Sequence, residues 1–230
     1  MRQGEVSMNR LAALCLLAPA LLLAEDYTER QVFTHPLAAD GKVYLKNDIG
    51  EIHINVSDRK DVRIVAIKKA HDSDQHSGPA RVAELRVDVR HSPDEIRIRG
   101  DWPHRDVTRL LRGKSKLQID YELEVPRGVR LQVENDIGEV HINGADNDVI
   151  VRNGIGEAYI GLADSFQPRR VYLHTKIGEV QSSFPGRTSG WLGQKFTRIL
   201  DGKSTLDVRV SIGEIRISGG SGKMRKITEL

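Results

Sequence analysis

The amino-acid sequence predicts an all-β protein whose strands are wound into a β-solenoid, a coil of stacked turns. Three observations support this prediction. Apolar and polar residues alternate with a period of two through most of the chain, which is typical of strands with one buried face. The segment NDIGEIHIN at 47–55 returns as NDIGEVHIN at 135–143. Its central Ile-Gly-Glu triplet occurs three more times, and such repeats indicate an architecture of stacked units.

Residues 1–24 are expected to be a secretory signal and not part of the fold. Arg10 supplies a basic flank, and an uncharged run from Leu11 ends at the small residue Ala24, a suitable cleavage position. This run is shorter than the roughly 20 apolar residues that a transmembrane helix needs. It contains Cys15, the only cysteine, so the mature chain is expected to hold no disulfide. We therefore expect an exported protein in the periplasm, at the cell surface or outside the cell.

The mature chain is expected to be one domain. Its strands are predicted at nine alternating runs, 42–48, 61–69, 84–92, 95–101, 116–126, 129–136, 148–154, 170–176 and 205–211. Polar stretches with Gly and Pro predict loops at 70–84 and 182–196. We expect a domain over 25–218, made of an insertion-rich part with an inserted β-hairpin region (25–127) and a repeat-dense part (128–218), followed by a flexible basic tail (219–230).

The Ile-Gly-Glu triplet has a mechanical explanation. Val133, Asn135 and Ile137 point to one face of a strand at period two, and Val140 must also face inward, although its spacing from Ile137 is odd. A positive φ or a bulge at Gly138 would reset the phase, so each triplet is predicted to be a corner. The predicted corner residues are Ile49, Gly50, Glu51, Ile137, Gly138, Glu139, Ile155, Gly156, Glu157, Ile177, Gly178, Glu179, Ile212, Gly213 and Glu214.

Two polar columns follow from stacking these corners. Asn47, Asn135 and Asn153 are expected to share a column and to bond along the stack. The triplet glutamates form a second column, in which like charges repel unless cations or water compensate them. His53, His141 and Arg216 are the nearby candidates for compensation. A bound divalent cation is the alternative, but the Gly-Gly and Asp pattern of calcium-binding solenoid repeats is absent.

Three segments resemble the DUF4097 family of bacterial adhesins, over residues 34–218. They are the opening GKVYLKNDIGEIHI, the middle LQIDYELEVPRGVRLQVENDIGEVHING with Pro126 before the repeats, and the closing GKSTLDVRVSIGEIRIS. The resemblance implies an exported or membrane-tethered β-solenoid of the cell envelope that works in adhesion. It supplies no catalytic residues. The chain differs from the tethered members because it lacks a transmembrane helix.

Other functional classes find little support. The 35 basic and 32 acidic residues make a mixed surface, so we expect no nucleic-acid partner. Gly-Lys-Ser occurs at 113–115 and at 202–204, but a phosphate-binding loop needs a glycine five positions earlier, where Thr108 and Thr197 stand. The mature chain has no cysteine and no nucleophile-elbow motif. We expect no cofactor and no catalytic residue.

Three further segments have both a solvated and a functional interpretation. HDSDQH at 71–76 contains possible metal ligands, although its flexible composition favours a solvated loop, and we expect no metal site. PHRDVTRLLRGKSK at 103–116 is either a solvated loop or a contact with anionic lipid or polysaccharide. Trp191 either caps the last coils or is an exposed contact residue.

These observations predict a non-enzymatic, exported bacterial adhesin or interaction scaffold of the cell envelope. Its partner is expected to be an envelope or surface ligand, protein or polysaccharide. Two alternatives stay open. One is a carbohydrate-active hydrolase or lyase on the same fold, which would need a deep groove with two convergent carboxylates. The other is an envelope sensor or assembly factor.

Overall fold

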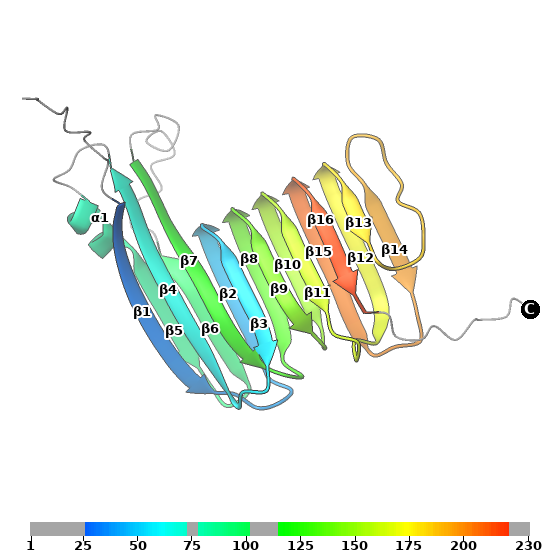
Figure 1. The fold of residues 1–230 in the computed structure, drawn as a ribbon, viewed down its shortest axis with the longest axis horizontal. Helices are drawn as coiled ribbons and strands as arrows, with labels where there is room; N and C mark the ends of the chain where they lie inside the picture. Colours follow the sequence, from blue (N-terminus) through cyan, green and yellow to red (C-terminus); the bar gives the residue numbers. More distant parts are fainter. Residues whose placement is uncertain (1–25, 73–77, 102–114, 221–230) are drawn as a thin grey trace, which may run out of the picture.

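A computed structural model describes residues 26–72, 78–101 and 115–220, which form two mixed eight-stranded sheets and one short helix (Figure 1). Sheet A has the order β1 (Asp26–Pro36), β4 (Asp61–Asp72), β7 (Ser115–Pro126), β3 (Ile52–Ser57), β9 (Val140–Ala145), β11 (Ala158–Leu162), β16 (Ile215–Gly219), β13 (Val180–Ser182). Sheet B has the order β14 (Lys195–Ile199), β12 (Pro168–Ile177), β15 (Ser204–Ile212), β10 (Val149–Ile155), β8 (Arg130–Ile137), β2 (Lys42–Ile49), β6 (Glu95–Asp101), β5 (Arg86–His91). The chain is all-β, as the alternating pattern predicts.

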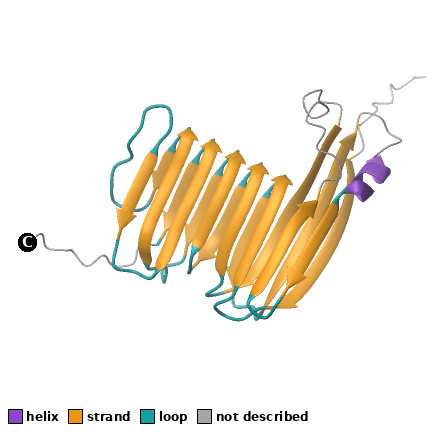
Figure 2. Ribbon diagram, turned by 180° about the vertical axis from the view of Figure 1, so that it is seen from behind, coloured by secondary structure: helices purple, strands orange, loops and turns teal. Residues whose placement is uncertain are grey.

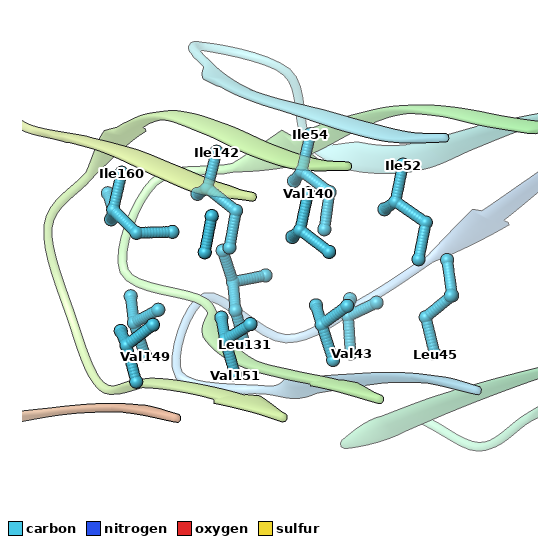
Figure 3. Packing of buried hydrophobic residues seen from close by; sticks show 14 of the residues in the cluster. Val43, Leu45, Ile52, Ile54, Leu131, Val140, Ile142, Val149, Val151 and Ile160 are labelled. Carbon is cyan, nitrogen blue, oxygen red and sulfur yellow. The ribbon is translucent and has the colours of Figure 1, made fainter. Parts of the chain in front are cut away.

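The core lies between the two sheets. Every second residue of a strand points inward, so the aliphatic residues of sheet A meet those of sheet B. In Figure 3, Ile52, Ile54 and Val140 of sheet A face Val43 and Leu45 of sheet B. These side chains are at most 1% exposed. The stability of the chain therefore depends on Val, Ile and Leu packing between two sheets.

Five strands of sheet B continue through a corner into sheet A, forming the pairs β2–β3, β8–β9, β10–β11, β12–β13 and β15–β16. Neighbouring pairs are parallel and in register, for example β10 with β8 and β11 with β9. Their order in space is not their order in the chain, because β15–β16 lies between β10–β11 and β12–β13. The triplets at 155 and 177 are therefore not direct neighbours, although their short spacing in sequence suits consecutive coils.

Both ends of the stack carry antiparallel strands. At one end β1 pairs with β4, β4 with β7, and β5 with β6. At the other end β14 pairs with β12 (Figures 1 and 2). Antiparallel pairing thus ends the parallel series of both sheets at the first end but only that of sheet B at the second, where β13 pairs in parallel with β16. The free edge strands of the described sheets are β1 and β13 in sheet A, and β14 and β5 in sheet B.

Each of the nine predicted runs overlaps a strand, although the run at 84–92 begins at the last residue of the helix. The loop predicted at 70–84 is only partly a loop, because α1 (Gly78–Glu84) occupies its end. Pro79 suits the first turn of a helix and Val82 is buried, but seven residues are too few for a recognisable helical period. Within the described residues, no helix is long and apolar enough to cross a membrane.

Several predicted segments lie outside the described residues. They are the signal at 1–24, residues 221–230 of the tail, residues 73–76 of the histidine-aspartate cluster and residues 103–114 of the basic segment.

Candidate interaction surfaces

The five Ile-Gly-Glu triplets lie where a strand of sheet B turns into a strand of sheet A. Each triplet glycine has a φ between 128° and 140°, a conformation that residues with a side chain rarely adopt. The glycine N–H of one corner donates to the isoleucine carbonyl of the next, for example Gly138 to Ile155 over 2.9 Å. The corners therefore stack in register, in the order Gly50, Gly138, Gly156, Gly213 and Gly178.

The triplet isoleucines do not point inward, which corrects the prediction made for Ile137. The last inward residue of β8 is the buried Asn135, and the backbone turns before the buried Val140. This turn carries the side chain of Ile137 to the outer edge of the stack. The exposed fractions are 36% for Ile137, 49% for Ile155, 45% for Ile212 and 44% for Ile177, while Ile49 is half-buried.

The triplet isoleucines, exposed except for the half-buried Ile49, form a line along the corners that we call the corner ridge. Leu192 extends it, because its carbonyl accepts the N–H of Gly178 over 3.0 Å, as an isoleucine carbonyl does at the other corners. The side chain of Leu192 is 61% exposed, and the neighbouring Trp191 is 97% exposed. Trp191 is thus an exposed residue at the end of the stack and does not pack on the last coils as a cap. The corner ridge consists of Ile49, Ile137, Ile155, Ile212, Ile177 and Leu192.

The asparagine column lies inside the corners. Asn47, Asn135 and Asn153 are buried, and Asn47 donates to Asn135 over 3.3 Å. The other amides bond mainly to corner carbonyls: Asn135 donates to Gly50 over 3.1 Å and Asn153 to Gly138 over 2.9 Å. Each of these two amides therefore donates a hydrogen bond to a glycine carbonyl that has no backbone N–H partner at the corner.

The glutamates of the triplets face solvent beside the corner ridge, and four of them bind the residue two positions later. Glu51 lies 3.4 Å from His53, Glu139 lies 2.8 Å from His141, and Glu214 lies 2.7 Å from Arg216. Glu157 accepts a hydrogen bond from Tyr159, a partner that the sequence did not suggest. These partners offset the repulsion between the stacked carboxylates.

The partners of the glutamates also stack on one another across sheet A. The rings of His53 and His141 are 4.7 Å apart, and those of His141 and Tyr159 are 4.6 Å apart. Arg216 lies over Tyr159 at 5.4 Å. In the described part of the chain, no group of three or more His, Cys, Asp or Glu side chains is placed to hold a metal ion.

The outer face of sheet B carries a line of charged residues that we call the basic row. In-register pairing places one member on each of seven neighbouring strands, in the order Lys195, His174, Arg209, Arg152, Glu134, Lys46 and Arg99. Like charges directly opposite each other destabilise a sheet. Arg209 opposite Arg152 and Lys46 opposite Arg99 therefore work against the fold unless other groups compensate them.

Asp207 compensates the two arginines at the centre of the basic row. Its carboxylate accepts two hydrogen bonds from Arg209 and one from Arg152, each of 3.0 Å. These hydrogen bonds raise the pKa of the Arg209 guanidinium above its ordinary value. Among the described residues, Nη1 of Arg209 and both Nε and Nη2 of Arg152 have no acceptor. Asp207 thus holds both side chains in place and leaves donors available.

A shallow hollow of about 550 Å³ lies between the basic row and the corner ridge, across β8, β10, β15 and β12. Its floor is low because Gly154 and Ser211, which stand directly before their triplets, are small. The residues at the same position of the other repeats have larger side chains. Arg152, Arg209 and His174 lie along one side, and Lys176 also lines it. The acidic residues of the hollow are Glu134 and Asp136. Three cationic side chains and two carboxylates therefore surround an open, polar hollow.

The sequence contains a signal for the basic row. Lys46, Glu134, Arg152, His174 and Arg209 each stand three positions before a triplet isoleucine. Aligning the repeats by their triplets puts these five residues in one column. What the alignment does not provide is the order of the coils, which brings Arg209 beside Arg152 and His174.

Comparisons with known proteins leave the family open. No protein-family model and no curated protein matches the chain. A putative cell adhesion protein from Clostridium sporogenes has a similar solved structure, with 14% identity, a TM-score of 0.43, and coverage of 85% of this chain and 100% of that one. A putative adhesin from Bacteroides fragilis gives 9% identity, a TM-score of 0.27, and coverage of 82% and 97%. Similarities this weak assign no function to the chain.

Proposed function

We propose that the chain is a non-enzymatic interaction scaffold of the adhesin type, exported to the bacterial cell envelope or surface and built as a β-solenoid. The observation that carries the proposal is the register of the five corners, which places equivalent side chains in unbroken rows across neighbouring strands. A linear surface polymer repeats its chemistry in the same way, so one kind of contact recurs from strand to strand. Stacked-repeat proteins use such extended surfaces for binding.

The corner ridge supports the same proposal. Four of its five isoleucines and Leu192 are exposed, and only Ile49 is half-buried. A contiguous line of exposed aliphatic side chains is uncommon on a monomer and is typical of contact surfaces. Export is supported by the composition of residues 1–24, and adhesion by the resemblance to the DUF4097 family.

A carbohydrate-active enzyme is the second candidate, and one observation favours it. Glu134 and Asp136 line the same hollow, and a glycosidase needs two carboxyl groups that face one sugar linkage. The hollow is shallow and open, however, and Lys46 lies 3.9 Å from Glu134. The Glu134 carboxylate is therefore already engaged by a cation of the neighbouring strand.

The test is a screen of the purified chain without residues 1–24 against peptidoglycan and a panel of neutral and acidic polysaccharides. Binding is measured by biolayer interferometry, and the same mixtures are searched for products by chromatography. We expect binding without products, and single exposed substitutions that weaken it gradually. Product formation that Glu134→Gln or Asp136→Asn lowers by about 10²–10⁴-fold would establish the enzyme instead. If nothing in the panel binds, the scaffold proposal fails.

A further inference from the structure

The proposal made here rests on the scaffold function and names its ligand class. We propose that the basic row and the hollow beside it bind a linear polysaccharide with a carboxylate on each sugar. The binding face runs across sheet B from β14 to β6, perpendicular to the strands. It uses the side chains of Lys195, His174, Arg209, Arg152, Lys46 and Arg99, with Lys176 at the hollow.

The charge of this face favours an anionic ligand. The basic row has five cationic side chains and one carboxylate, Glu134, in addition to His174. With Asp207 beside Arg209 and Arg152, and Asp88 directly opposite Arg99 on β5, five cations face three carboxylates. Cross-strand pairs of like charge cost stability, and a bound polyanion would relieve that cost.

The geometry of the donors favours carboxylates. A guanidinium presents its N–H groups in a planar fork that matches a carboxylate. Asp207 already demonstrates this match with Arg209, through paired bonds of 3.0 Å to both carboxylate oxygens. The remaining donors of Arg152 and Arg209 lie at the border of the hollow, where a second carboxylate can enter beside Ser211.

The spacing of the row favours a polymer of sugars. Neighbouring strands are about 4.8 Å apart, so the cations of the basic row recur at intervals of one or two strands along the face. One pyranose unit in an extended chain has a length similar to one strand spacing, so the carboxylates of such a polymer can reach successive cations of the row. The hollow is lined mainly by polar side chains, which suits the hydroxyl groups of a glycan.

A single-stranded nucleic acid fits this face less well. Such ligands stack their bases on exposed aromatic rings. The ring of Tyr172 is instead flanked by Arg209 at 4.8 Å and Lys195 at 5.4 Å. These cations occupy the space over the ring in which a base would stack.

The experiment measures binding of the chain without residues 1–24 to polygalacturonate, with neutral dextran and single-stranded DNA as comparison ligands. We expect polygalacturonate to bind, dextran not to bind, and affinity to fall as salt is added, because exposed charges are screened. Lys176→Gln and Lys195→Gln should each weaken binding roughly three- to tenfold. The control is Arg30→Gln, which removes one charge from the opposite sheet, where Arg30 lies 3.8 Å from Glu122.

A second variant tests the hollow itself without changing charge. Ser211→Tyr fills the floor of the hollow and should lower the affinity for polygalacturonate at least as much as Lys176→Gln does. Thermal unfolding of every variant checks that the fold is kept. Equal affinity of Ser211→Tyr, Lys176→Gln and Arg30→Gln would overturn the proposal, and so would tighter binding of DNA than of polygalacturonate. Binding of neutral glycans or peptidoglycan alone would overturn it and leave the scaffold function standing.

Discussion

Gly138 packs directly against Gly50 of the neighbouring corner. A Cβ atom at position 138 would lie 2.1 Å from the carbonyl oxygen of Gly50, well inside van der Waals contact. The φ of Gly138 is 129°, which also disfavours any side chain. The same two conditions recur at Gly156, whose added Cβ would meet the Gly138 carbonyl at 2.1 Å. The corners thus require glycine both for backbone conformation and for stacking distance.

We therefore expect Gly138→Val to destabilise the protein more than Glu139→Ala. The glycine variant must strain the backbone and separate two coils, whereas Glu139 loses only a partly exposed contact with His141. The difference in unfolding free energy should be on the order of 1–3 kcal/mol or more. Urea denaturation of both variants measures it, and coincident midpoints would show that this corner does not need glycine.

The sequence predicts the strands well because alternation is a local property. Ile142 and Val133 are buried where the pattern expects them. Gly138 has the positive φ that the sequence predicts, but the orientation of Ile137 was predicted wrongly. The alternation already breaks at Asp136, because Asp136 and Ile137 are both exposed, and the odd spacing to Val140 does not show where this break begins.

The order of the coils could not be predicted for a different reason. The strands β12 and β15 carry similar alternating patterns, so either can pair in register with β10. Only the tertiary fold distinguishes them: β12 also pairs with the antiparallel β14, and β14 forms the edge of sheet B. The basic row depends on this order, because it brings Arg209 between Arg152 and His174.

The buried asparagine column gives a second prediction. Asn135→Ala removes the amide that donates to the Gly50 carbonyl and the oxygen that accepts from Asn47, and both partners lie in the interior. The unfolding free energy should fall by about 1–3 kcal/mol. The matched control is Asn143→Ala, which breaks an exposed asparagine pair with Asn55 and should cost within about 0.5 kcal/mol. Similar losses in both variants would argue against a structural role specific to the buried column.

The stability of the protein should depend on pH through His35. Burial lowers the pKa of His35 and the nearby His91 lowers it further, with the two rings stacked at 4.2 Å. The unfolded chain takes up this proton below about pH 6.5, while the folded chain resists it. The contribution of His35 to the unfolding free energy is therefore fully present above about pH 6.5 and is lost as the pH falls below that value.

We expect His35→Gln to flatten the decrease in unfolding free energy between about pH 6.5 and pH 5, a range above the ordinary pKa values of carboxyl groups. Thr34→Gln, a substitution on the same strand that adds no titrating group, serves as the control and should keep the wild-type profile. Chemical denaturation at several pH values provides the measurement. If the unfolding free energy of His35→Gln depends on pH as that of the wild type does, His35 is not the source of the pH dependence.

The last prediction contrasts two isoleucines that belong to neighbouring corners and have the same chemistry. Ile142 is fully buried between the sheets, while Ile155 on the corner ridge is 49% exposed. Ile142→Ala leaves a cavity and should lower the unfolding free energy by about 2–5 kcal/mol. Ile155→Ala removes a side chain that is about half solvated and leaves no closed cavity, so its cost should be about 1 kcal/mol or less. Urea unfolding of the two variants compares them directly. A loss at Ile155 as large as that at Ile142 would place the triplet isoleucines in the core, as the alternation alone suggested, and would remove the exposed ridge as a binding surface.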